Sequence, residues 1–103
     1  MSNYTEVLDL EKLPPGTGIA IKVEDNAIAL FNVDGTVYVI GNSCPHAGGS
    51  LGGGRLDGKI VTCRMHGMKF DVTTGFFNGT TSFGVQSYPV KVGDGKIFIS
   101  FDI

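Results

Sequence analysis

The sequence has no tryptophan, and it has only two cysteines and two histidines. One pair of cysteines is too few for the disulfide framework that stabilises small secreted scaffolds. Eight basic against ten acidic side chains give a net charge of −2, without the basic excess that is typical of nucleic-acid-binding domains. The apolar runs are much shorter than the roughly 20 residues that cross a membrane as a helix.

The first six residues also lack the basic-then-apolar order of a signal peptide. Together these absences predict a soluble, cytoplasmic protein that has neither nucleic acid nor a membrane as its partner. In a reducing compartment, cysteines and histidines that occur together indicate a metal site more often than a disulfide.

Apolar residues are plentiful, at 42% of 103 residues, and only 17% of the residues are charged. This composition excludes a disordered chain, and the length predicts one domain over residues 1–103. Sixteen glycines without a repeat indicate a fold rich in turns and loops.

Short β-branched and aromatic runs predict strands and almost no helix. The candidate strands cover residues 18–23, 27–31, 36–40, 59–62, 87–92 and 96–100. The one helical pattern, residues 9–13, is stopped by two prolines and predicts a single turn. Several short strands with turn signals between them predict an all-β fold, an antiparallel sandwich or a small barrel.

Two local signals refine this prediction. Asp34-Gly35 between two apolar runs predicts a tight hairpin, because both residues tolerate a positive φ. Pro89 cannot donate a backbone hydrogen bond, so its strand is expected to begin there or to lie at a sheet edge.

Residues 41–58 break the strand pattern, and residues 41–54 within them are a long glycine-rich loop. A loop of this length without regular structure inside a compact domain usually serves a function. It contains Cys44 and His46 as C-x-H, and Cys63 and His66 follow as C-x-x-H, so that every cysteine and histidine of the chain lies in one of these two units.

Four interpretations of the two units are open. Both cysteines and both histidines could be ordinary buried residues, or a Cys44–Cys63 disulfide could form and leave the histidines unexplained. Structural zinc accepts two cysteines and two histidines, but its sites usually pair cysteine with cysteine and histidine with histidine. One cysteine and one histidine in each unit suit a two-iron cluster with thiolates on one iron and imidazoles on the other.

The two units, CPHAG at residues 44–48 and CRMHGMKFD at residues 63–71, resemble the Rieske-type [2Fe–2S] ferredoxin family. The resemblance extends over nearly the whole chain. It implies one [2Fe–2S] cluster as cofactor, with Cys44 and Cys63 on the inner iron and His46 and His66 on the outer iron. It also implies an all-β base of two small sheets, with a cluster-binding subdomain inserted at about residues 42–75.

The same resemblance implies an electron-transfer component of a multicomponent aromatic-ring-hydroxylating dioxygenase, in aromatic hydrocarbon catabolism. Its expected partners are a flavoprotein ferredoxin reductase and a terminal oxygenase, and the expected state is a monomer. We find no nucleotide fingerprint and no catalytic residues, so we expect an electron carrier and not an enzyme. The alternatives are a zinc-stabilised, non-redox interaction module and a Rieske subunit of another oxidoreductase.

The ligand set and its neighbours bear on the reduction potential. Two ferric ions, two sulfides, two thiolates and two neutral imidazoles carry no net charge, so an electron is accepted more easily than by an all-cysteine cluster. High-potential relatives carry serine and tyrosine hydroxyls where this chain has Met68 and Phe70, and they have an extra disulfide. The sequence therefore predicts a potential at the low end of the Rieske range, about −150 mV.

The charges also differ along the chain. Residues 41–70 contain four basic side chains, Arg55, Lys59, Arg64 and Lys69, and one acidic side chain, Asp57. This excess predicts a locally basic cluster end that attracts acidic partner surfaces, unless the charges point in several directions and cancel.

Overall fold

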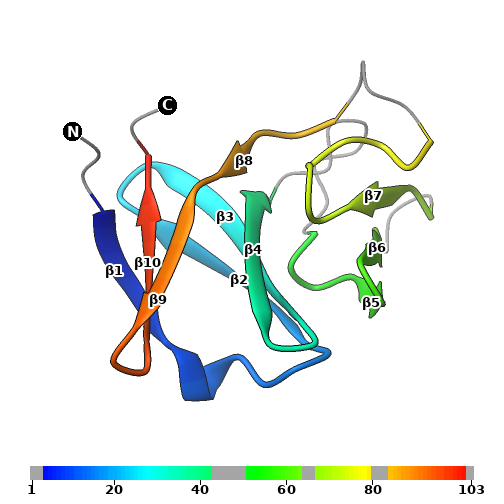
Figure 1. Cartoon of the computed structure of the whole chain (residues 1–103). Helices are drawn as coiled ribbons and strands as arrows, with labels where there is room; N and C mark the ends of the chain where they lie inside the picture. Colours follow the sequence, from blue (N-terminus) through cyan, green and yellow to red (C-terminus); the bar gives the residue numbers. More distant parts are fainter. Residues whose placement is uncertain (1–3, 43–50, 64–66, 80–83, 102–103) are drawn as a thin grey trace.

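The computed structural model describes residues 4–42, 51–63, 67–79 and 84–101 (Figure 1). These residues form three antiparallel sheets, in the orders β1-β10-β9, β2-β3-β4-β8 and β5-β6-β7. The elements are β1 (Tyr4–Asp9), the 3₁₀ helix η1 (Leu10–Lys12), β2 (Gly18–Val23), β3 (Asn26–Val33), β4 (Thr36–Gly41), β5 (Arg55–Asp57), β6 (Ile60–Thr62), β7 (Lys69–Asp71), β8 (Ser87–Tyr88), β9 (Val90–Gly93) and β10 (Lys96–Ser100). The all-β, antiparallel prediction is confirmed.

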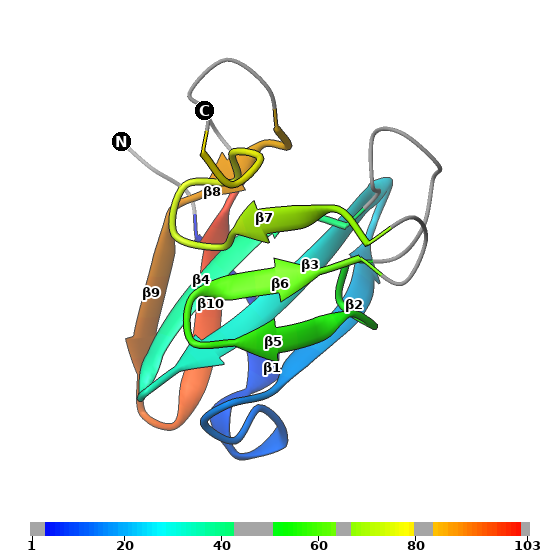
Figure 2. The same ribbon diagram turned by 90° about the vertical axis from the view of Figure 1, so that its right-hand side faces the viewer.

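The sheet β2-β3-β4-β8 lies between the other two sheets, as both views show (Figures 1 and 2). We call β1-β10-β9 the first sheet, β2-β3-β4-β8 the middle sheet and β5-β6-β7 the third sheet. Because side chains alternate along a strand, a strand of the middle sheet must be apolar on both faces. This explains why residues 28–31 of β3 are all apolar and fully buried.

Each face of the middle sheet has its own apolar core. The core between the first and middle sheets, here the basal core, consists of Leu13, Ile28, Leu30, Val37, Val39, Ile97 and Ile99. The core between the middle and third sheets, here the distal core, consists of Ala29, Phe31, Ile40, Leu51, Val61, Cys63, Phe70 and Val72. The distal core therefore contains one of the four expected metal ligands.

The hairpin between β3 and β4 has the predicted turn. Asp34 and Gly35 have φ of 52° and 97°, so both central residues are left-handed, as a type I′ turn requires. Asp94 and Gly95, with φ of 53° and 73°, make the same kind of turn between β9 and β10.

The predicted strand over residues 87–92 is two strands in two different sheets. β8 pairs with β4 in the middle sheet, and β9 pairs with β10 in the first sheet. Pro89 lies between them, where the chain passes from one sheet to the other. Since proline has no N–H to donate, it suits this crossing point, and both strands are edge strands as the proline predicts.

Candidate metal centre

Cys63 follows β6 directly and lies in the distal core with 1% of its surface exposed. Its backbone N–H donates to the carbonyl oxygen of Met68, at 2.7 Å. This bond joins the two described sides of the segment that contains His66. The other three predicted ligands, Cys44, His46 and His66, lie outside the described residues.

Asn42 begins the segment that carries Cys44 and His46. Its carbonyl oxygen accepts from the N–H of Leu51 at 2.8 Å, and its side-chain Oδ1 accepts from the N–H of Gly52 at 2.8 Å. The two described ends of this segment are therefore held together by two hydrogen bonds.

Both segments that carry the predicted ligands are joined to the same core. Leu51, at the end of the first segment, and Cys63, at the start of the second, are both fully or almost fully buried in the distal core. In Figure 2, β6 ends and β7 begins at the right-hand side of the third sheet. A single group that bridges the two segments at this end of the molecule fits this arrangement.

The surroundings of Cys63 suit a metal-bound thiolate. An isolated buried charge is costly, so a thiolate in an apolar core needs a cation as its partner. Two sulfur and two imidazole donors are the set that holds a Rieske cluster, and Cys63 is buried among apolar side chains as its inner ligand would be. The residues therefore fit a [2Fe–2S] cluster.

Met68 and Phe70, which follow His66 in the sequence, both contact the distal core. Met68 is half-buried and packs against this core. Phe70 has no exposed surface, and its ring meets the ring of Phe77 edge to face, with centroids 5.8 Å apart. Neither Met68 nor Phe70 carries a hydroxyl. They therefore cannot donate the hydrogen bonds toward the cluster that the serine and tyrosine hydroxyls donate in the high-potential relatives.

Asp71 ends β7 and holds the turn that follows. Its Oδ1 accepts from the backbone N–H and the hydroxyl of Thr73, at 2.9 and 2.6 Å, and its Oδ2 lies 3.4 Å from Lys59 Nζ. Partial burial acts to raise the pKa of Asp71, but the Thr73 hydrogen bonds and the Lys59 charge outweigh it. The net effect lowers the pKa of this carboxyl below its ordinary value.

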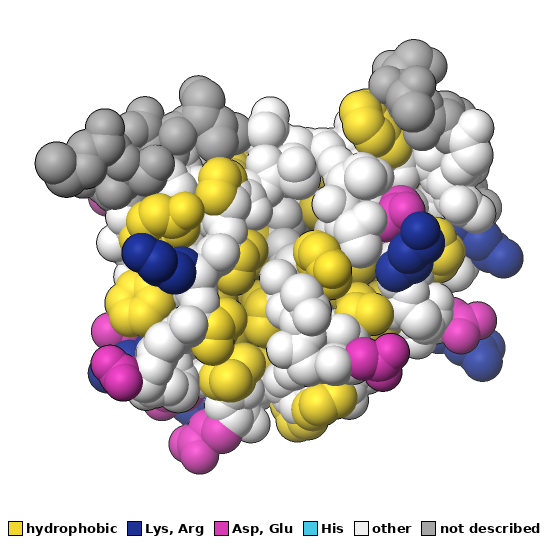
Figure 3. Space-filling model, in the orientation of Figure 1, with side chains coloured by type: hydrophobic (Ala, Val, Ile, Leu, Met, Phe, Trp, Pro, Cys, Tyr) yellow, Lys and Arg dark blue, Asp and Glu magenta, His cyan; other side chains and the backbone are white. Residues whose placement is uncertain are grey.

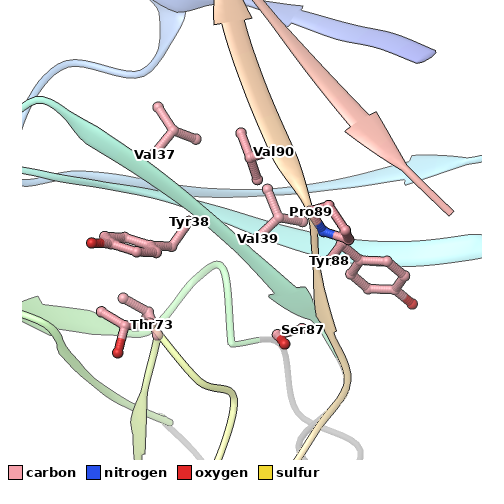
Figure 4. A pocket seen from close by; sticks show the side chains of 9 residues that line it. Val37, Tyr38, Val39, Thr73, Ser87, Tyr88, Pro89 and Val90 are labelled. Carbon is pink, nitrogen blue, oxygen red and sulfur yellow. The ribbon is translucent and has the colours of Figure 1, made fainter. Parts of the chain in front are cut away.

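A groove of about 470 Å³ lies between β4, the β8–β9 crossing and the start of the turn after β7 (Figures 3 and 4). Val37, Tyr38, Val39, Val72, Thr73, Ser87, Tyr88, Pro89 and Val90 line it. The lining is apolar or hydroxyl-bearing, and the groove lies at the end of β7 away from Met68. We therefore place the candidate site at the ligand-bearing segments and not in this groove.

Sequence reasoning predicted the four ligands, which stay a prediction, but it missed the residues that hold the two segments together. Asn42 and Gly52 carry no motif of their own. An asparagine between a strand end and a C-x-H unit is the one available signal, since asparagine side chains often bond to nearby backbone groups. Among the described residues, no helix is long and apolar enough to pass through a membrane.

Comparison with known proteins identifies the family. The family model for the Rieske [2Fe–2S] domain matches residues 3–89. The ferredoxin component of the naphthalene 1,2-dioxygenase/salicylate 5-hydroxylase systems of Ralstonia sp. is 30% identical over 97% of each chain.

Solved structures agree with this match. The Sphingomonas yanoikuyae B1 ferredoxin is 33% identical, covers 95% of this chain and 98% of its own, and superposes with a TM-score of 0.86. A chain from the complex of reduced oxygenase and oxidized ferredoxin in carbazole 1,9a-dioxygenase is 26% identical over 94% of this chain and 92% of its own, with a TM-score of 0.83. The C-x-H and C-x-x-H units, the antiparallel fold and these matches together show that the chain belongs to the Rieske [2Fe–2S] domain family.

Proposed function

We propose that this chain is a one-electron carrier that delivers electrons to the terminal oxygenase of a ring-hydroxylating dioxygenase system. The observation that carries the proposal is the similarity to ferredoxin components over almost the full length of both chains. Ferredoxin components carry electrons within such systems and leave the chemistry on the substrate to the oxygenase. This favours a carrier over the alternatives of a zinc-stabilised, non-redox module and a Rieske subunit of another oxidoreductase.

The proposed ligands are Cys44 and Cys63 for the inner iron and His46 and His66 for the outer iron. The burial of Cys63 supports its assignment to the inner iron, since the histidine-bound iron needs access to a partner. When bound, the cluster accepts and releases one electron. The chain's own residues fix the two segments on one core and keep water from the inner thiolate.

The proposed partners are a terminal oxygenase and a flavoprotein reductase. A complex of oxygenase and ferredoxin among the similar structures supports the oxygenase. A reductase follows from the need of any carrier for an electron source. A cytoplasmic location and a monomeric state stay predictions from the sequence.

We also propose that residues 1–103 form one domain, with residues 42–75 as its cluster-binding subdomain. The third sheet, from Arg55 to Asp71, lies within that range. It packs on the middle sheet through the distal core, which supports one continuous structure.

The test is to purify the chain without oxygen and to measure iron, acid-labile sulfide, zinc and the visible spectrum. We expect two irons and two sulfides per chain, a reddish-brown colour, and reoxidation of the reduced chain by a ring-hydroxylating oxygenase. His66→Ala should lose the cluster, whereas Lys69→Ala, an exposed neighbour at the start of β7, should keep it. A colourless chain with one zinc would instead establish the structural module.

A further inference from the structure

Asn42 connects three parts of the chain at the base of the first ligand-bearing segment. Its N–H donates to the carbonyl oxygen of Ala27 in β3 at 3.0 Å. Its carbonyl oxygen and its Oδ1 accept from Leu51 and Gly52, each at 2.8 Å. The Asn42 side chain thus adds a second hydrogen bond next to the backbone hydrogen bond between Leu51 and Asn42, which already joins the two ends of the segment.

Gly52 is held on its other side by the middle sheet. A Cβ built on Gly52 would lie 2.5 Å from the backbone nitrogen of Ala20 and 2.6 Å from its Cβ. Real contacts are never this short, so Gly52 lies directly against β2 with no room for a side chain. The N–H that Asn42 binds is consequently fixed in space by the backbone of β2.

Leu51 continues this connection to the second ligand-bearing segment. It is fully buried in the distal core, the core that also holds Cys63. Packed interiors transmit small displacements, because side chains there have few voids to move into. A shift of Leu51 and Gly52, which follow the first segment directly, is therefore transmitted to the core around Cys63.

We propose that Asn42 is a positioning residue for the metal centre. Its Oδ1, through the N–H of Gly52, sets the segment that carries Cys44 and His46 in register with Cys63. This inference rests on the proposed function, because it takes these residues as cluster ligands. Removing the acceptor should alter the electronic environment of the iron centre as well as the stability of the chain.

The chain offers a matched control in Asn32. Its Nδ2 donates to the carbonyl oxygen of Leu13 and its Oδ1 accepts from the N–H of Gly35, both at 2.8 Å. Asn32 lies at the opposite end of the β3–β4 hairpin and is 3% exposed. A substitution there should cost stability without reaching the metal centre.

The experiment compares Asn42→Leu, Asn42→Asp and Asn32→Leu in the loaded protein. Leucine matches the shape of asparagine without an acceptor, and aspartate keeps an acceptor oxygen. The readouts are the electron paramagnetic resonance spectrum of the reduced protein, the reduction potential, and the rate of iron release to a chelator. We expect Asn42→Leu to shift the spectrum and the potential and to release iron at least about fivefold faster, as the loss of one hydrogen bond implies.

Asn42→Asp should restore the wild-type spectrum and release rate, and Asn32→Leu should lower only the thermal midpoint. Wild-type spectrum, potential and release rate in Asn42→Leu would overturn the proposal, as would equal spectral shifts in Asn42→Leu and Asn32→Leu. If Asn42→Leu does not fold, the iron-release rates of Asn42→Asp and the wild type are compared. A release from Asn42→Asp as fast as that of an unfolded chain counts against the proposal. A wild-type chain without two irons would refute the proposed function itself, which separates the two failures.

Discussion

Phe70 is the residue whose chemistry bears most directly on the reduction potential. Its ring is fully buried in the distal core together with Cys63, and it packs edge to face against Phe77. In the high-potential relatives, from which the second motif departs at this position, a tyrosine hydroxyl donates toward the cluster. Hydrogen bonds to cluster sulfur stabilise the reduced, more negative state, so their absence here favours a low potential.

We therefore predict that Phe70→Tyr raises the reduction potential. One hydrogen bond worth about 1 kcal/mol in favour of the reduced state corresponds to an increase of about 40 mV for one electron. A potentiometric titration followed by electron paramagnetic resonance measures the change. Phe77→Tyr adds a hydroxyl to the neighbouring ring and should leave the potential within about 10 mV of the wild type. An unchanged or lower potential in Phe70→Tyr contradicts the prediction.

Asp71 gives the chain a stability that depends on pH. Its folded-state pKa is lowered, so it stabilises the fold fully above the unfolded value of about 3.9 and loses this effect as the pH falls through the folded pKa. Asp71→Asn should lower the free energy of unfolding at pH 7 by about 1–2 kcal/mol. The difference from wild type should shrink as the pH falls below about 4.

Thermal unfolding followed by circular dichroism between pH 3 and pH 7 measures this difference. Lys59→Ala is the control for the ion pair. Because the Lys59 side chain is 61% exposed, its loss should cost less than about 0.5 kcal/mol, and Thr73→Val should cost more than Lys59→Ala. A larger effect of Lys59→Ala would assign the lowered pKa chiefly to the ion pair.

At the scale of elements, Gly52 shows how the segment after the ligands is seated on β2. Gly52→Ala places a methyl group 2.5 Å from the Ala20 backbone nitrogen, which cannot move aside as a flexible side chain can. We expect a loss of about 1–3 kcal/mol and a fall of the thermal midpoint by at least about 4 °C.

Gly93→Ala is the matched control for this prediction. Gly93 lies in β9, and a Cβ there meets nothing within 4 Å. The substitution should be neutral or slightly stabilising, because it restricts the unfolded chain without a clash. Equal midpoints for the two alanine variants would show that the Gly52 segment moves freely away from β2.

The sequence predicted the elements that carry strong local signals. The Asp34-Gly35 hairpin and the one-turn helix near Leu10 were found, because turn residues and prolines act within a few positions. β5 and β7 were missed, because three residues are too few for their charged–apolar–charged alternation to stand out from the surrounding loops. The role of Asn42 was also missed, since its partner Gly52 is ten residues away and nothing local identifies the pair.

The strand split at Pro89 shows a second limit of local reasoning. Residues 87–92 look continuous, yet β8 and β9 belong to different sheets. Which sheet an edge strand joins depends on tertiary pairing, and this is not visible in alternation alone.

At the scale of the whole molecule, basic residues of the third sheet are divided between its two ends. Arg55, Thr62 and Lys69 stand in one cross-strand row, next to Cys63 and Met68. Lys59 lies at the other end, where it pairs with Asp71. Arg64 lies outside the described residues, so two of the four predicted basic side chains, Arg55 and Lys69, are seen at the ligand end, and both are exposed.

This row predicts that electrostatic attraction speeds the encounter with an acidic partner surface. The double variant Arg55→Glu/Lys69→Glu should slow electron transfer to the oxygenase about tenfold or more at low ionic strength. The double variant Lys12→Glu/Lys91→Glu changes the net charge equally but alters η1 and β9, and it should slow the transfer much less.

Stopped-flow measurements from low salt to about 0.5 M separate these cases, because screening at high salt removes attraction between exposed charges. The rates of all three proteins should then converge. Equal slowing by both double variants would mean that only the net charge acts on the encounter. A faster reaction of Arg55→Glu/Lys69→Glu would mean that the partner surface is basic.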